Sequence, residues 1–159
     1  MGTTFRRKQN RLPLGVYRGA AAYFLTLRCP GNTAPFSDSD LVSSCLDVLQ
    51  SCSVKHHVSV HAYCFMPDHL HLLIEGTEGA FVPDFVKEFK QLTGYAYRRR
   101  HSRSLWQKSY YDHVLRKEEA IWDVARYVVA NPVRRGLVSQ PSHYPHSGSF
   151  VWGGAVMEA

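Results

Sequence analysis

Residues 58–76 read VSVHAYCFMPDHLHLLIEG, and this stretch decides the fold that we expect. The alternation from Val58 to Met66 and the apolar run from His69 to Glu75 are typical of β-strands. Pro67-Asp68 indicates a tight turn, so the two strands should pair in antiparallel fashion. Side chains alternate along a strand. One face of the first strand should therefore carry Val58, Val60, Ala62, Cys64 and Met66, and the other Ser59, His61, Tyr63 and Phe65.

Further elements flank these two strands. Residues 21–29 alternate as a first strand, and Ser37-Asp38 indicates the start of a helix with the stripe Leu41, Cys45, Leu46 and Leu49. Later segments predict a basic amphipathic helix over residues 81–100, a fourth strand over residues 105–116 and a last helix over residues 117–130. This order predicts an α+β fold: a ferredoxin-like βαββαβ antiparallel sheet with helices on one face and an additional C-terminal helix.

The chain divides into three parts by composition. Residues 1–19 are basic and polar and predict an N-terminal arm, and residues 20–138 predict a single domain. Residues 139–159 are rich in Ser, Pro, His and Gly, so we expect a loosely ordered tail with one anchoring segment at Phe150-Val151-Trp152.

Composition narrows the classes of protein. The chain has 159 residues, of which 45% are hydrophobic and 20% charged, and this predicts a folded domain and argues against disorder. Its longest apolar stretch is far shorter than the roughly 20 residues of a membrane helix. No signal-peptide core follows the basic N-terminus, so we expect a cytoplasmic protein without a membrane partner. The net charge of +6 and the pI near 9.3 are compatible with a polyanionic partner.

The four cysteines are spread along the chain. They form no C-x-x-C pair, which argues against a zinc-finger or thioredoxin-type site. Cys45 and Cys52 are seven residues apart on one face of the expected helix. We therefore expect them to pack in the core.

His69 and His71 are the first candidate site. Because they are two residues apart on a strand, they should point to the same side, with β-carbons roughly 6–7 Å apart. Two imidazoles at that spacing can bind one divalent metal ion and leave positions open for substrate oxygens. A His-x-His pair also arises by chance in a chain with nine histidines, so the spacing alone leaves metal binding open.

Asp123, Tyr127 and Asn131 follow one another at intervals of four residues on the last expected helix. Such neighbours lie on one face, so a tyrosine and an amide could face the same pocket. An amide carbonyl oxygen is also a possible metal ligand. Two other interpretations stay open: Tyr127 as an interface aromatic residue, and Asn131 as the cap of a turn that continues through Pro132.

Three segments occur in order along the chain: FMPDHLHLLIEG, LWQKSYYDHVLR and ARYVVANPVRRGLV. Together they resemble the REP-associated tyrosine transposases, a branch of the single-tyrosine HUH transposase-like family. The basic arm and the HYPHSGSF segment are similar to that family too, so the resemblance covers about residues 6–150.

The resemblance implies a function and a site. It implies that His69 and His71 bind the metal, that Tyr127 is the nucleophile, and that Asn131, where related transposases carry Gln, is the third metal-site residue. The implied reaction is metal-dependent cleavage and strand transfer of single-stranded DNA through a 5′-phosphotyrosine intermediate. Mg²⁺ is implied by the family, whereas histidine ligation suits Mn²⁺ better.

Several alternatives within the site remain. Tyr110 and Tyr111 are rival tyrosines on the expected fourth strand. If the Pro67-Asp68 turn has two residues, Cys64 opposes His71, and a Cys-His-His zinc site becomes conceivable. His61 and Asp123 are candidates for a general base.

DNA contacts should come from cationic side chains. The expected set is Arg6, Arg7, Lys8, Arg11, Arg98, Arg99, Arg100, Arg103, Arg116, Arg134 and Arg135. Aromatic residues that could stack on unpaired bases are Tyr95, Tyr97, Trp106 and Tyr110. The resemblance implies that the partner is single-stranded, hairpin-forming repeat DNA of the chromosome.

Other functions and assemblies also remain possible. One alternative is a non-catalytic protein that binds single-stranded DNA or RNA hairpins. A two-histidine phosphoesterase is less compatible with the sequence, because it needs a second histidine pair. Either a monomer or a homodimer is compatible with the resemblance.

Overall fold

The computed structural model describes residues 21–116 and 119–158. Its strands are β1 (Ala22–Arg28), β2 (Val58–Met66), β3 (His69–Gly76), β4 (Tyr111–Val114) and β5 (Ser147–Gly148). Its helices are α1 (Ser39–Lys55), α2 (Val82–His101), α3 (Ile121–Val129), α4 (Asn131–Arg134) and α5 (Ala155–Glu158), with the 3₁₀ turns η2 (Pro35–Ser37) and η3 (Pro141–His143). None of the helices in this part of the chain is long and apolar enough to cross a membrane.

The five strands form one antiparallel sheet in the order β4-β1-β3-β2-β5. β1 therefore lies between β3 and β4, although the α1–β2–β3–α2 segment separates β1 from β4 along the chain. The predicted α+β ferredoxin-like arrangement is confirmed. The strands over residues 22–28, 58–66 and 69–76 agree with their predicted ranges to within one residue.

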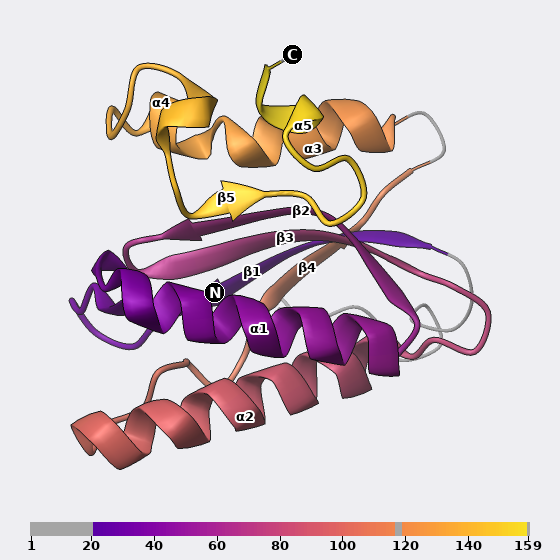
Figure 1. Cartoon of the computed structure of the whole chain (residues 1–159). Helices are drawn as coiled ribbons and strands as arrows, with labels where there is room; N and C mark the ends of the chain where they lie inside the picture. The colour runs from indigo at the N-terminus through magenta and orange to yellow at the C-terminus, as the bar shows by residue number, and fades with distance from the viewer. Residues whose placement is uncertain (1–20, 117–118, 159) are drawn as a thin grey trace, which may run out of the picture.

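Helices cover both faces of the sheet (Figure 1). α1 and α2 lie below the sheet in this view, whereas α3, α4 and α5 lie above it. The two helices of the ferredoxin-like unit share one face, as expected, and the additional C-terminal helix lies on the other. The apolar residues Ala125, Val128 and Val129 of α3 are buried against Ala62 and Leu73 of the sheet, which gives the second face a core of its own.

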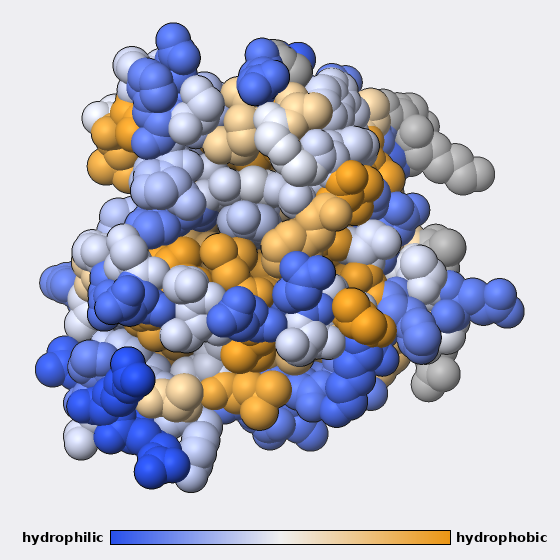
Figure 2. Space-filling model, viewed as in Figure 1, coloured by the Kyte–Doolittle hydropathy of each residue, from blue (hydrophilic) through white to orange (hydrophobic). Residues whose placement is uncertain are grey.

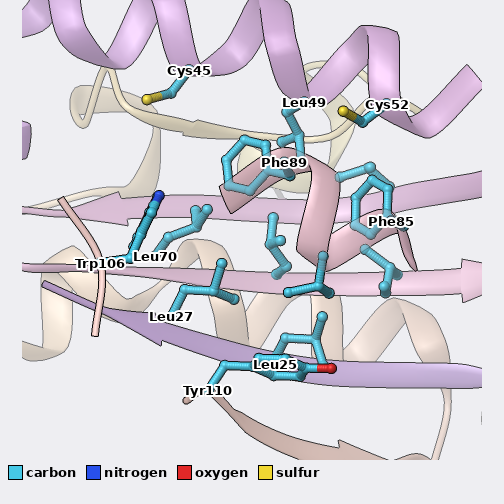
Figure 3. Close-up of a cluster of buried hydrophobic side chains, with 14 of the residues drawn as sticks. Leu25, Leu27, Cys45, Leu49, Cys52, Leu70, Phe85, Phe89, Trp106 and Tyr110 are labelled. Carbon is cyan, nitrogen blue, oxygen red and sulfur yellow. The ribbon is translucent and has the colours of Figure 1, made fainter. Parts of the chain in front are cut away.

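The core between the sheet and helices α1 and α2 is the larger one, and we call it the first core (Figure 3). Alternate residues of β1, such as Leu25 and Leu27, point into it and meet Phe85 and Phe89 of α2. Cys45 and Cys52 of α1 are buried in this core, as expected, with Leu49, which is fully buried.

A β-bulge changes the faces of β2. The register places Val60 opposite Ile74 but Ala62 opposite Leu73, so His61 is an extra residue with no residue opposite it on β3. Val58 and Val60 belong to the first core, whereas residues 62, 64 and 66 face the opposite side. The prediction that Val58, Val60, Ala62, Cys64 and Met66 share one face is therefore wrong, because the bulge reverses the alternation.

The fourth strand is shorter than predicted and spans only residues 111–114. Leu105 and Trp106 instead pack beneath α2 in the first core. The indole nitrogen of Trp106 donates to the hydroxyl of Thr93 at 2.9 Å. Lys90 Nζ donates to the carbonyls of residues 107 and 108, so these backbone groups have partners outside the sheet.

The last helix and the tail also differ from expectation. α3 begins at Ile121, later than the predicted start at residue 117. The prediction of a loosely ordered tail is wrong: β5 pairs with β2, and the Tyr144 hydroxyl donates to the carbonyl of Phe65. Tyr144 and Val156 are buried beside α3. We call the cluster that they form with α3 and the sheet the second core. The expected anchors Phe150 and Trp152 pack against the first and second cores, respectively.

Candidate active site

His69 and His71 lie on the face of the sheet that α3 covers. Their neighbours Leu70 and Leu72 point into the first core, whereas Leu73 belongs to the second core. Strand alternation therefore turns both imidazoles towards the layer that carries Tyr127. The predicted common orientation of the two histidines agrees with this geometry.

Each histidine of the pair uses its Nδ1 atom for a hydrogen bond to a neighbouring side chain. His69 Nδ1 lies 2.6 Å from Asp68 Oδ1, and His71 Nδ1 lies 3.0 Å from Thr26 Oγ1. The two Nε2 atoms face each other at 3.0 Å. Metal-binding histidines usually use one nitrogen for the metal and the other for such a hydrogen bond. The Nε2 atoms are thus the pair available for a ligand.

The donor set fits a divalent ion. Two ligands about 2.1 Å from an ion, at right angles, stand roughly 3 Å apart, which matches the Nε2 spacing. Burial is the largest cause that lowers the pKa of His71 to about 3, and nearby cationic groups add to it. His71 is therefore neutral near pH 7, as a metal ligand has to be.

The Cys-His-His alternative gains no support. Cys64 does stand opposite His71, as the short turn predicted. Its thiol donates to the sulfur of Met66 at 3.7 Å, however, and burial raises the pKa of Cys64 to about 12. Across residues 21–116 and 119–158, no three His, Cys, Asp or Glu side chains come together to hold a metal ion. Within these residues, a third protein ligand would have to be of another type.

Asn131 lies at the junction of α3 and α4. It is buried, and its Nδ2 donates to the carbonyl of Val128 at 3.3 Å, so Oδ1 is the atom that a metal could use. Ala130 occupies the cap position of α4, so the alternative that Asn131 caps this turn is wrong. No hydrogen bond joins Asn131 to His69 or His71 in the described part of the chain. Its role as a metal ligand stays a prediction.

Tyr127 is exposed, with 57% of its surface accessible, and Arg134 of α4 folds back onto it. The guanidinium carbon lies 3.7 Å from the centre of the Tyr127 ring, and Arg134 Nη2 donates to the Tyr127 carbonyl at 2.9 Å. This pairing of a cation and an aromatic face limits the positions that the ring adopts. A mobile surface tyrosine would lack such a contact.

Tyr127 borders a cavity of about 430 Å³. The cavity is lined by Phe24, His113, Leu115, Glu119, Ala120, Asp123, Val124 and Tyr127. The Phe24 ring also stacks on His71, with ring centres 5.3 Å apart. Phe24 thus belongs to the wall of the cavity and also contacts the histidine pair, so it links the two candidate groups in space.

The arginines fall into two groups. Arg28, Arg134 and Arg135 are close enough to His71 for their charges to lower its pKa. The residues in the last turn of α2, such as Arg98, instead lie in the layer on the other side of the sheet (Figure 1). The remaining expected contacts near that end are Arg99, Arg100 and Arg103. Figure 2 shows strongly hydrophilic side chains gathered at that end of α2, at the lower left.

The other expected DNA contacts are divided as well. Arg116 precedes α3, and its backbone N–H donates to Glu119, at the edge of the Tyr127 cavity. The basic residues of the expected N-terminal arm, Arg6, Arg7, Lys8 and Arg11, lie outside the described residues.

Most of the expected stacking aromatics are structural. Tyr97, Trp106 and Tyr110 are buried in the first core, whereas Tyr95 is 66% exposed and free of that role. The rival nucleophile Tyr111 borders a separate cavity of about 480 Å³. Neither Tyr110 nor Tyr111 lines the cavity of Tyr127.

The two candidate bases have different surroundings. His61 Nε2 lies 2.7 Å from Glu75 Oε2, and its ring packs on Trp152. Glu75 is four residues, about 13 Å of strand, beyond His71. His61 is therefore directed away from the pair. Asp123 lines the cavity of Tyr127 and stays a candidate.

Several residues beside the site were missed at the sequence level. Phe24, Thr26 and Arg28 alternate along β1 with the core residues Leu25 and Leu27, so they face the histidines. The signal was present in the segment FLTLR, where an aromatic, a hydroxyl and a cation occupy every second position. Only the register with β3, which pairs Thr26 with His71, shows that these positions lie beside the histidines.

The chain is similar to known proteins along most of its length. The family model described as "Transposase IS200 like" matches residues 24–131, which include the histidine pair, Tyr127 and Asn131. A Haemophilus influenzae protein that carries the name REP-associated tyrosine transposase is 23% identical over 138 residues, which cover 79% of this chain and 77% of the relative. The REP-associated tyrosine transposase of Escherichia coli is 25% identical over 88 residues, or 55% of this chain and 52% of the relative.

A solved structure shares the fold. It is a REP-associated tyrosine transposase bound to a REP hairpin, with a TM-score of 0.69 and 19% sequence identity. The match covers 92% of this chain and 82% of that chain, so it includes the helices on both faces of the sheet.

Proposed function

The chain belongs to the IS200-like transposase family, and from this premise we propose that it is a metal-dependent endonuclease and strand transferase acting on single-stranded DNA. The observation that carries the proposal is the position of Phe24. Its ring contacts His71, and the same residue lines the cavity of Tyr127. A phosphate at this wall would be close to a nucleophile and to a metal-binding pair.

The proposed reaction is a transesterification. The Tyr127 oxygen forms a bond to the phosphorus of a phosphodiester, and the bond from phosphorus to the 3′ oxygen breaks. The products are a 5′-phosphotyrosine adduct and a free 3′-hydroxyl end. Attack by a 3′-hydroxyl reverses the step and joins strands without a nucleotide cofactor, because the adduct keeps the energy of the phosphodiester bond.

We assign the metal to His69, His71 and Asn131. A divalent ion such as Mg²⁺ or Mn²⁺, when bound there, supplies positive charge that polarises the scissile phosphate. Asp68 and Thr26 hold the imidazoles in the orientation that this binding needs. Arg134 fixes the ring of Tyr127 while its own charge attracts the phosphate chain.

The proposed substrate is hairpin-forming repeat DNA. The structurally similar transposase is bound to a REP hairpin, and the net charge of +6 favours a polyanion. Arg28, Arg134 and Arg135 lie near His71 and would contact the cleaved strand. The basic end of α2, on the other side of the sheet, would contact a more distant part of the DNA.

A denaturing gel tests the proposal. The protein is incubated with labelled single strands from the flanks of its own gene, with Mg²⁺ or Mn²⁺, beside a Tyr127→Phe variant. We expect a covalent band from the wild-type protein that is absent with EDTA and absent from the variant, while both proteins retain the DNA on a native gel. Equal adduct yields from both proteins would refute the assignment of the nucleophile. Hairpin retention in EDTA without any adduct would favour a binding protein without catalysis.

A further inference from the structure

A histidine and a glutamate border the cavity of Tyr127 and belong neither to the proposed metal site nor to the proposed DNA contacts. His113 lies on β4, directly opposite Phe24 of β1, and Glu119 lies just before α3. His113 Nε2 is 3.2 Å from Glu119 Oε1. Both side chains line the cavity together with Asp123 and Tyr127.

The Glu119 carboxylate is fixed in place. The backbone N–H of Arg116 donates to Glu119 Oε1 at 3.1 Å, the same oxygen that faces His113. These two hydrogen bonds, the one from Arg116 first, lower the pKa of Glu119. An ionised carboxylate only accepts hydrogen bonds. His113 Nε2 must therefore be the donor, which leaves Nδ1 of a neutral imidazole with a free lone pair.

A tyrosine nucleophile needs a group to take its proton. Its ordinary pKa is near 10, so little tyrosinate exists at neutral pH, and a well-placed base speeds such a step by about 10²–10⁴-fold. Asp123 is a poor match because an ordinary aspartate has a pKa near 4. An imidazole, with an ordinary value near 6.5, is the better acceptor and also returns a proton at neutral pH.

We propose that His113 takes the proton of Tyr127 during cleavage, and that Glu119 is the residue that positions its ring. This inference rests on the proposed function, because it supplies the base for that reaction. A nucleophile, a base and a group that orients the base form an arrangement that recurs in enzymes that activate a hydroxyl for attack.

The step balances without another protein group. The Tyr127 oxygen bonds to phosphorus as its proton passes to His113 Nδ1, and the departing 3′ oxygen takes a proton from solvent water. In rejoining, a 3′-hydroxyl attacks the adduct and gives its proton to solvent water, and the imidazolium of His113 returns a proton to the leaving Tyr127 oxygen. The same residue is thus a base in one direction and an acid in the other.

The surroundings of His113 suit both roles. Among the described residues, the other titratable groups that line the cavity are Glu119, Asp123 and Tyr127, and Arg116 lies next to Glu119. Glu119 accepts a hydrogen bond from His113 Nε2 whether the ring is neutral or protonated, so both roles use the same ring orientation. Phe24 contacts His71 and pairs with His113 across the strands, so the proposed base lies next to the proposed metal site.

The first test measures two rates against pH. Adduct formation is followed under single-turnover conditions from about pH 5.5 to pH 9, a range centred on imidazole titration, and rejoining is followed by adding a 3′-hydroxyl strand to purified adduct. We expect adduct formation to rise with pH and rejoining to fall. His113→Asn should slow adduct formation near pH 7 by about 10²-fold or more and remove both dependences.

Two further variants sharpen this test. Glu119→Gln should give a smaller loss and shift the pH profile, because the ring remains but loses its charged partner. His143→Asn, which removes an exposed histidine of η3, is the matched control and should keep the wild-type profile. A wild-type profile in His113→Asn would overturn the inference, as would loss of the pH dependence in Asp123→Asn alone.

The second test needs no cleavage. Proton–nitrogen NMR of protein with labelled histidine reports which ring nitrogen of His113 carries the proton. We expect Nε2–H with a bare Nδ1 in the wild type, and a weaker preference in Glu119→Gln. A predominant Nδ1–H form would overturn the inference even if no DNA adduct were ever found. Absence of any adduct would by itself count against the proposed function.

Discussion

The two faces of the sheet differ in the kinds of side chain that they bury. On the face covered by α1 and α2, large apolar side chains such as Phe85 and Phe89 interlock in a continuous first core. On the face covered by α3, the second core is smaller, and polar groups such as His69, Thr26 and Asn131 are buried beside it. Stability is thus concentrated on one side of β1 and β3, and the proposed chemistry on the other. Substitutions on each face should therefore change different measured quantities.

The largest expected effect comes from the histidine pair. Replacing both His69 and His71 with Ala should lower metal-dependent adduct formation by about 10³-fold or more, since polarisation of the phosphate contributes several kcal/mol. Retention of hairpin DNA in EDTA should be unchanged. Adduct formation by this variant under tight chelation would show that the pair has no metal role.

On the opposite face, Phe89→Ala should lower the free energy of unfolding by about 3–5 kcal/mol, because Phe89 is fully buried and its removal leaves a cavity. Urea denaturation measures the change. Leu92→Ala, on the same helix but 49% exposed, is the control and should stay within about 0.5 kcal/mol of wild type. Similar losses from the two variants would contradict the position of the first core.

A smaller effect should come from the tail. Tyr144→Phe removes the hydroxyl that donates to the Phe65 carbonyl and leaves this buried acceptor unpaired, which costs about 1–3 kcal/mol. Thermal unfolding measures the loss. Removal of residues 144–158 should expose Val128 and Val129 of α3, because Tyr144 and Val156 cover them. If truncation left the unfolding temperature unchanged, the tail would not be part of the second core.

The smallest effect concerns Arg134. Arg134→Gln removes the cation above the exposed Tyr127 ring, a contact of about 0.5–1 kcal/mol, so stability should hardly change. Adduct formation should fall several-fold, and its salt dependence should weaken because one phosphate contact is lost. Arg99→Gln, at the distant end of α2, is the matched control. A larger fall in adduct formation in Arg99→Gln than in Arg134→Gln would indicate that the cleaved strand lies on the face of the sheet covered by α2.

The sequence predicted most of the first face, because its signals are local. Alternation defines β1 and β3, and a helical stripe defines α1. The sequence-based predictions failed where contacts between residues far apart in the chain determine the structure. The bulge at His61 interrupts an alternation that the sequence continues without a break, and the aromatic run near Leu105 packs under α2 although it alternates like a strand.

The candidate site divides in the same way. His69, His71 and Tyr127 stand out through spacing and family resemblance. Thr26 and Arg28 become visible only when β1 is aligned with β3. His113 and Glu119 are joined by a hydrogen bond between a strand and the segment before α3, and no local pattern marks them as a pair.

The second core also bears on the order in which the parts of the candidate site form during synthesis. Strand β3, which carries His69 and His71, and the helices α1 and α2 of the first core all precede residue 102. The side chains that bury α3, Tyr144 and Val156, are translated later. A nascent chain can therefore form its histidine pair while the helix of Tyr127 still lacks its cover. The two layers that carry the parts of the candidate site therefore become ordered at different stages of synthesis.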